Sequence, residues 1–104
     1  MNRREFLFNM TGGRCFYCGC LLDFNNFHLD HIVPKSKGGK NPDNLVPACI
    51  DCNEFKSDLS VKEFRQKIMD ARSKTIQGRI LAKYYKLNHK SVRFFCEDLF
   101  DGTL

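Results

Sequence analysis

Two histidines and an aspartate lie within four positions of the stretch HLDHIVP, residues 28–34. The imidazole of His31 can take a proton from water near neutral pH. Asp30 beside it offers a carboxylate oxygen and Asn53 an amide oxygen, and hard divalent ions such as Mg²⁺ favour both. Hydrolysis of a phosphodiester needs such groups: an activated water, a metal ion on the phosphate and positive charge nearby.

Four cysteines form two C-x-x-C pairs, Cys15 with Cys18 and Cys49 with Cys52, with thirty residues between the pairs. Two intervening residues let both thiolates of a pair face one point about 2.3 Å away, so two pairs complete a tetrahedral Zn²⁺ site. Four thiolates leave no open coordination position, and we therefore expect one structural zinc rather than a catalytic one. The alternative is a reduced or disulfide-bonded set, which a cytosolic setting disfavours.

Two further cysteines lie outside these pairs. Cys20 makes the run CFYCGC ambiguous, because it could compete with Cys18 as a ligand. The usual knuckle spacing favours Cys15 with Cys18. Cys96 stands alone in the C-terminal part and is most simply a small buried apolar residue.

Local patterns predict the elements that must position these groups. We expect a helix or arm over 2–10, strands over 27–33 and 45–49, a loop over 34–44 and a short helix from Ile50. The two zinc pairs tie the segment before the first strand to the segment after the second. This connection predicts an antiparallel hairpin beside the short helix.

The proposed chemistry sets a geometric problem for the first strand. Neighbouring side chains on an ideal strand point to opposite faces, yet Asp30 and His31 must both reach one phosphate. We therefore predict a strand end or a bulge near residues 30–32 that redirects one of them. The alternative is a phosphate bound at the hairpin edge, between the two side chains.

The C-terminal part reads as helical. Ser60 and Glu63 form a capping box, which predicts a helix start followed by one apolar stripe. Further helices are expected over 74–87 and over 91–100. In the last of these, the spacing predicts that one set of apolar residues faces the core: Val92, Phe95 and Leu99.

The excess positive charge lies in the same C-terminal part. Residues 1–59 hold seven Lys/Arg and seven Asp/Glu, whereas residues 60–104 hold ten against five, which accounts for the whole net charge of +5. A basic extension on a neutral core points to a polyanion partner, most commonly nucleic acid. A solvated helical surface is the alternative. The basic residues expected to contact phosphate are Lys62, Arg65, Lys67, Arg72, Lys74, Arg79, Lys83 and Lys86.

Composition places the chain among small globular domains. The hydrophobic fraction is 42%, and ten Phe with no Trp predict a Phe-filled core. No apolar run reaches the roughly 18 residues of a membrane span, and the N-terminal sequence lacks a signal-peptide pattern, so we expect a cytoplasmic protein without a membrane partner. We expect an α+β fold, with an N-terminal arm and zinc-stapled core over 1–59 and a basic helical extension packed on or next to it over 60–104.

The run DHIVPKSKGG followed by NLVPACIDCNEFKSD resembles the HNH endonucleases over about residues 14–58. The resemblance implies a ββα-metal fold in which His31 is the general base and Asp30 and Asn53 bind the catalytic ion. It also implies that Asn44 hydrogen-bonds backbone near the histidine and holds it in place. The family often has His at the position of Asn53, so this chain is an H-N-N version.

The resemblance also suggests how the site contacts its substrate. Lys56 falls where the family often has a lysine near the phosphates, and His28, Lys35 and Lys37 are further candidates for phosphate contact. Alternatively, His28 orients the site or is simply exposed. The implied activity is hydrolysis of DNA, expected to be double-stranded, with Mg²⁺ or Mn²⁺, leaving 5′-phosphate and 3′-hydroxyl ends in a bacterial or phage-infected cell.

Two other functions fit parts of the sequence. A non-catalytic zinc module that binds nucleic acid explains the cysteines and the charge, but it gives no reason for Asp30, His31 and Asn53. Zinc-dependent base deamination needs a histidine among the zinc ligands and a glutamate in an H-x-E element. The stretch HLD lacks that glutamate, and four cysteines already fill the zinc site.

Overall fold

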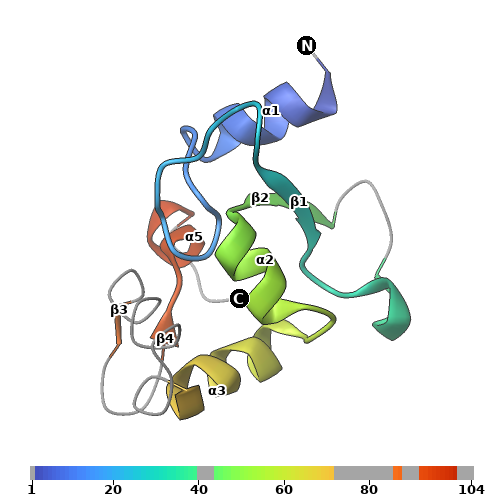
Figure 1. Ribbon diagram of the computed structural model, residues 1–104, viewed down its shortest axis with the longest axis vertical. Coiled ribbons are helices and arrows are strands. Elements are labelled where there is room, and N and C mark those ends of the chain that lie inside the picture. Colours follow the sequence, from blue (N-terminus) through green and yellow to red (C-terminus); the bar gives the residue numbers. More distant parts are fainter. Residues whose placement is uncertain (1, 40–43, 72–85, 88–91, 101–104) are drawn as a thin grey trace.

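The computed structural model describes residues 2–39, 44–71, 86–87 and 92–100. These residues form a small α+β fold in which a two-stranded hairpin lies beside helices, as predicted (Figure 1). The elements are α1 (Arg3–Met10), β1 (His28–His31), the 3₁₀ helix η1 (Lys35–Lys37), β2 (Leu45–Ala48), α2 (Ile50–Lys56), α3 (Val61–Ala71), β3 (Lys86–Leu87), β4 (Val92–Arg93) and α5 (Phe95–Leu99). Within the described ranges, no helix is both long and apolar enough to cross a membrane.

Strands β1 and β2 form the predicted antiparallel hairpin. Asp30 lies opposite Val46 and His31 opposite Leu45, in a regular register without an extra residue. Strand β1 ends at His31, so the strand-end form of the prediction is confirmed and the bulge is not present. Helix α2 follows β2 directly and packs on β1 (Figure 1).

Side-chain caps define where the helices begin. The side chain of Asn2 accepts a hydrogen bond from the Glu5 backbone N–H at 2.8 Å, which starts α1. The predicted capping box at the start of α3 is confirmed: the backbone N–H of Ser60 donates to Glu63 Oε1 at 2.9 Å, and the N–H of Glu63 donates to Ser60 Oγ at 3.2 Å. The capping-box pattern is local, which is why the sequence predicts it well.

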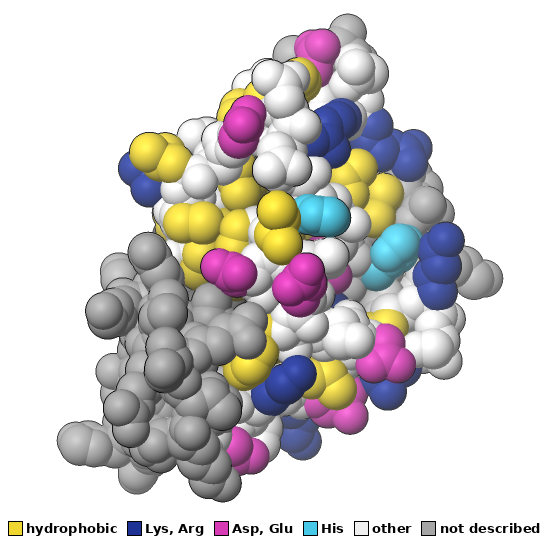
Figure 2. All heavy atoms as spheres, in the orientation of Figure 1, with side chains coloured by type: hydrophobic (Ala, Val, Ile, Leu, Met, Phe, Trp, Pro, Cys, Tyr) yellow, Lys and Arg dark blue, Asp and Glu magenta, His cyan; other side chains and the backbone are white. Residues whose placement is uncertain are grey.

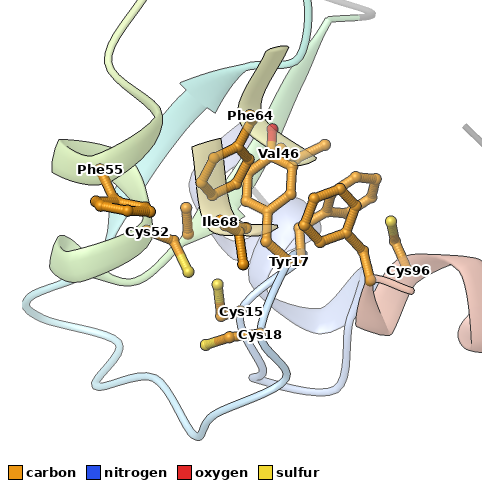
Figure 3. Packing of buried hydrophobic residues seen from close by; sticks show 12 residues of the cluster. Cys15, Tyr17, Cys18, Val46, Cys52, Phe55, Phe64, Ile68 and Cys96 are labelled. Carbon is orange, nitrogen blue, oxygen red and sulfur yellow. The ribbon is translucent and has the colours of Figure 1, made fainter. Parts of the chain in front are cut away.

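The core is built largely from aromatic rings, as the Phe-rich composition predicts. The Tyr17 ring meets Phe64 and Phe94 edge-on, with ring centroids 5.3 and 5.4 Å apart, and Phe64 stacks on Phe94. Figure 3 shows Tyr17 between Cys15 and Phe64, with its hydroxyl oxygen pointing away from the sulfurs of Cys15 and Cys18. Helix α3 contributes Phe64 and Ile68 to the same core, so the zinc segment and α3 share one apolar interior.

The predicted helices of the C-terminal part need two corrections. Residues 74–85 lie outside the described residues, but Lys86 and Leu87 form strand β3, so the helix predicted over 74–87 does not extend to its expected end. Strand β4 replaces the start of the helix predicted over 91–100, and only Phe95–Leu99 is helical.

The apolar stripe predicted for the last helix is wrong at Leu99, which is exposed. Phe95 is half-buried, and the buried apolar residues described here are Phe94 and Cys96. The backbone explains the difference: Phe95 and Cys96 donate their N–H groups to the carbonyls of Tyr17 and Phe16, at 2.8 and 3.0 Å. This pairing fixes which side chains face the core, and burial of Cys96 is confirmed.

A buried ion pair joins α3 to α5. Arg65 lies 2.6 Å from Glu97, and its guanidinium also stacks over the Phe94 ring at 4.5 Å. Glu97 is 2% exposed and also accepts the backbone N–H of Phe94 at 2.9 Å. Arg65 therefore serves packing, which corrects its assignment as a phosphate contact.

We expect Glu97→Ala to lower the free energy of unfolding by about 2 kcal/mol, because the change leaves a largely buried guanidinium without its carboxylate. Urea unfolding followed by circular dichroism measures the effect. Lys37→Met is the matched control, since it removes a surface pair of 3.6 Å with Glu63 whose partners are both about half exposed. The control should change stability by no more than roughly 0.5 kcal/mol, and equal effects of the two variants would contradict the prediction.

Candidate active site and zinc centre

The sulfur atoms of Cys15, Cys18, Cys49 and Cys52 lie within 4.8 Å of one another, three of them from buried residues. The distance between the Cys18 and Cys49 sulfurs is 3.8 Å. A tetrahedral zinc with Zn–S bonds of about 2.3 Å requires S···S edges of roughly 3.8 Å, so the geometry fits zinc. The predicted four-cysteine cluster is therefore present, and it can hold a metal ion.

The electrostatics of the cluster explain why it needs a cation. Burial opposes ionisation of Cys15, but hydrogen bonds from the neighbouring thiols outweigh it and lower the pKa of Cys15 well below its ordinary value. Hydrogen bonds to Cys15, Cys18 and Cys49 raise the pKa of Cys52 far above its ordinary value, and burial adds to this. A bound Zn²⁺ would let all four act as thiolates.

The fifth cysteine of this region, Cys20, is not part of the group of four. Its backbone carbonyl accepts the N–H of Cys15 at 2.8 Å, which closes the loop of the first C-x-x-C pair. In the second pair, the Cys49 side-chain sulfur accepts the backbone N–H of Cys52 at 3.3 Å and caps α2. The spacing argument for Cys15 with Cys18 is consistent with this arrangement.

A cavity of about 400 Å³ lies at the end of β1. Its lining includes all three residues of the predicted hydrolytic centre, Asp30, His31 and Asn53. The cavity forms where β1 ends and α2 passes beside it, so consecutive residues of the strand line one space. Figure 2 shows both described histidines on one face, with basic side chains beside them and acidic side chains below. The full lining is Leu29, Asp30, His31, Pro34, Lys35, Ser36, Asn53, Ser57 and Asp58.

Asn44 fastens the strand end next to His31. Its side-chain oxygen accepts the backbone N–H of Val33 at 2.8 Å, and its amide nitrogen donates to the Val33 carbonyl. Its own carbonyl accepts the N–H of Ile32 at 2.9 Å. Gly39 lies against the same contact, where an added Cβ would collide with the Val33 carbonyl. The contacts expected of Asn44 are therefore present, while its part in catalysis stays a prediction.

Asp30 is 6% exposed and bears two hydrogen-bonding partners on one oxygen. Tyr17 donates its hydroxyl to Asp30 Oδ2 at 2.7 Å, and the Lys56 amine lies 3.1 Å from the same atom. Burial, and then the charge of Asp30 and the hydrogen bond to it, raise the pKa of Tyr17 well above its ordinary value, so the phenol remains a donor. Among the described residues, Oδ1 has no hydrogen-bond partner.

The candidates for phosphate contact have different positions. Lys35 lines the cavity, whereas His28 is exposed at the other end of β1 and Lys37 pairs with Glu63 on the surface. Lys56 is fully buried, and its amine also donates to the His31 carbonyl at 2.7 Å. The predicted phosphate contact of Lys56 is therefore wrong in this structure, because the side chain points inward to the carboxylate.

Two lysines of the basic extension that the structure describes are exposed. Lys67 donates to the Phe55 carbonyl at 2.7 Å and lies over the Phe55 ring, and Lys62 is exposed as well, so phosphate contact by either stays a prediction. The predicted phosphate contacts at Arg72, Lys74, Arg79 and Lys83 lie outside the described residues.

Ser57 is a cavity residue that the sequence did not indicate. Among the described residues it is the one non-glycine with positive φ, at φ 51° and ψ −128°. Such a backbone costs roughly 1–3 kcal/mol and is common at functional sites. The Ser57 N–H donates to the Asn53 carbonyl at 3.0 Å, which ends α2 there. Nothing in the serine itself signals this conformation, since glycine is the usual choice.

Tyr17 is the other residue whose role the sequence did not indicate, although a signal existed. It is a tyrosine in a core filled with phenylalanine, and a buried phenol usually has a hydrogen-bond partner. Because Tyr17 lies inside the first C-x-x-C pair, its partner could be sought among groups brought close by the zinc. That partner is Asp30.

Replacing Cys52 tests the zinc centre. In Cys52→Ser, we expect the zinc content to fall from one per chain towards zero and the cooperative thermal transition to be lost, because a small domain held by zinc unfolds without it. A chromogenic chelator assay and circular dichroism measure the two effects. Cys20→Ser is the matched control and should retain one zinc. Loss of zinc in the control alone would instead make Cys20 a ligand.

Replacing Ser57 tests the strained backbone. We expect Ser57→Gly to raise the free energy of unfolding by roughly 1 kcal/mol, because glycine adopts positive φ without a Cβ clash. Ser57→Ala keeps the Cβ and should give no such gain. Urea unfolding of both variants decides the matter, and a stabilised alanine variant would contradict the strain at this position.

Comparisons with known proteins agree with this geometry. The family model for HNH endonucleases matches residues 15–69, just over half of the chain. The CRISPR-associated endonuclease Cas9 of Corynebacterium diphtheriae is 43% identical over 47 residues, covering 43% of this chain and 4% of that protein. The crystal structure of the Type II-C Cas9 enzyme from Actinomyces naeslundii superposes with a TM-score of 0.56 and 27% identity, covering 78% of this chain and 11% of that one.

The chain therefore spans only a small part of each of these relatives. The matched region contains both C-x-x-C pairs and all of Asp30, His31, Asn44 and Asn53. The chain belongs to the HNH endonuclease family.

Proposed function

We propose that this protein is a metal-dependent endonuclease that hydrolyses phosphodiester bonds in double-stranded DNA in the cytoplasm. The observation that carries the proposal is the shared cavity at the end of β1, where Asp30, His31 and Asn53 come together. A volume of about 400 Å³ has room for a phosphate, an attacking water and a hydrated ion. Membership of the HNH family supports a nuclease activity at this site.

His31 acts as the general base. His31 is half-buried at the end of β1. On one side, the backbone is fixed by hydrogen bonds between the Asn44 side chain and the Val33 backbone. The Lys56 amine fixes it on the other side by binding the His31 carbonyl at 2.7 Å. A backbone held on both sides limits the positions open to the imidazole, which favours proton transfer from a water on the phosphate.

Asp30 and Asn53 are the residues that would hold the catalytic ion. Their oxygens are hard ligands, and Oδ1 of Asp30 lacks a partner in the described part of the chain, so the donor set fits Mg²⁺ or Mn²⁺. An ion there would offset negative charge on the phosphate and on the leaving oxygen. With one carboxylate and one amide from the protein, the remaining coordination positions fall to water and phosphate.

The reaction forms one bond and breaks another. His31 takes a proton from water as the water oxygen bonds to phosphorus, and the bond from phosphorus to the 3′ oxygen breaks. The 3′ oxygen then acquires a proton. The products are a 5′-phosphate and a 3′-hydroxyl. Lys35, which lines the cavity, would contact a neighbouring phosphate.

The rival function is a zinc-stabilised module that binds nucleic acid without cutting it. It accounts for the four cysteines and the basic residues but not for the grouping of a histidine, a carboxylate and an amide around one cavity. The two functions differ in one result. The rival predicts that DNA is bound and left intact with every divalent ion.

Replacement of the proposed base tests the function. His31→Ala should reduce nicking of supercoiled plasmid in Mg²⁺ or Mn²⁺ by at least about 100-fold, because general-base catalysis commonly contributes that much. His28→Ala is the matched control, since it removes an exposed histidine of the same strand that does not line the cavity. The control should remain within a few-fold of wild type.

Zinc content and circular dichroism establish that both histidine variants are folded. Undiminished cleavage by His31→Ala would remove the proposed base, and equal losses in both variants would do the same. Plasmid gel assays across a series of divalent ions provide the measurement.

A further inference from the structure

The zinc-binding segment reaches the proposed ion site through one side chain. Tyr17 lies between Cys15 and Cys18, and its ring is fully buried. Its hydroxyl donates to Asp30 Oδ2 at 2.7 Å, in a buried contact that joins the first C-x-x-C pair to strand β1. The ring itself is held edge-on by the aromatic core, so the hydroxyl has little freedom to move.

Lys56 completes the environment of the same carboxylate. Its amine lies 3.1 Å from Asp30 Oδ2 and donates to the His31 carbonyl at 2.7 Å. The amine is fully buried, so it acts from beneath the cavity rather than on a substrate. Both partners of Asp30 therefore use one oxygen.

This arrangement decides how Asp30 can bind an ion. Two donors on Oδ2 fix the rotation of the carboxylate, and Oδ1 is the oxygen left for a metal. Outer partners of this kind hold metal ligands in orientation, and their loss commonly weakens metal binding by 10–100-fold. The position of Oδ1 thus depends on the position of Tyr17.

We infer that Tyr17 is a positioning residue for the ion-binding carboxylate, and that it links the placement of the zinc clasp to the placement of Asp30. The inference rests on the proposed function, because it takes Asp30 as a ligand of the divalent ion. Tyr17 contacts neither substrate nor ion, so it acts only through Asp30.

The test uses Tyr17→Phe in the full chain with its zinc bound. The change removes one hydroxyl and keeps the ring, so the core should remain packed. Binding of Mn²⁺ without DNA is measured by the electron paramagnetic resonance of free Mn²⁺. We expect the Kd for Mn²⁺ to rise about 10-fold, with one zinc per chain retained. Nicking should need correspondingly more Mn²⁺, while the rate at saturating Mn²⁺ recovers towards wild type.

Two further variants give the result its meaning. Asp30→Asn identifies the Mn²⁺ signal that belongs to this site. Phe8→Leu disturbs an aromatic cluster with Phe24 and Phe27 that does not include Tyr17, so it should lower stability without changing the Kd for Mn²⁺.

An unchanged Kd in Tyr17→Phe overturns the inference, and so does an equal rise in Phe8→Leu, which would make the effect one of general packing. If Asp30→Asn removes none of the Mn²⁺ binding that the wild type shows, the inference is overturned as well. If wild type binds Mn²⁺ more tightly than Tyr17→Phe but cuts no DNA with any ion, the positioning role stands and the proposed function fails.

Discussion

The structure depends on four sulfur atoms meeting at one point. They come from two segments that are far apart in the sequence, and the elements that they join are short: β1 and β2 have four residues each and α2 has seven. Elements of this length are not stable alone. The four cysteines together tie the segment before β1 to the segment after β2. Within the first pair, the backbone carbonyls of Phe16 and Tyr17 also accept hydrogen bonds from α5. Hairpin, helix and C-terminal segment are therefore placed by one constraint.

The ion pair under the cavity is better explained by function than by stability. Replacing a buried pair by apolar residues of similar size is often neutral or stabilising, so Asp30 and Lys56 are not needed for the fold as such. The position of Asp30 and Lys56 under the cavity gives a functional reason for the pair. In the proposed nuclease, the catalytic ion would need a carboxylate at this place, and Lys56 would offset the charge of that carboxylate when no ion is bound. The same amine binds the His31 carbonyl, so one cation contacts both the proposed ion ligand and the backbone of the proposed base.

Spacing in the sequence predicts the zinc clasp, the hairpin and the grouping of Asp30, His31 and Asn53, because these follow from short-range patterns and from the topology that zinc imposes. The inward direction of Lys56 could not be predicted in this way, since a lysine at the end of a short helix is usually exposed. The stripe expected to include Leu99 failed for a related reason. Backbone bonds to Phe16 and Tyr17 select the buried face there, and such long-range pairing leaves no periodic signal.

The four-cysteine cluster and the proposed ion site differ as a structural and a catalytic site should. Four thiolates would enclose a zinc ion completely, so that ion need never leave. The proposed second site has one carboxylate oxygen and one amide, with Lys56 reducing the attraction for a cation. Such a site binds an ion weakly until a substrate phosphate supplies further oxygens. By linkage, ion and phosphate must then strengthen each other's binding by the same factor. In the proposed nuclease, a complete catalytic centre therefore forms mainly when DNA is in place.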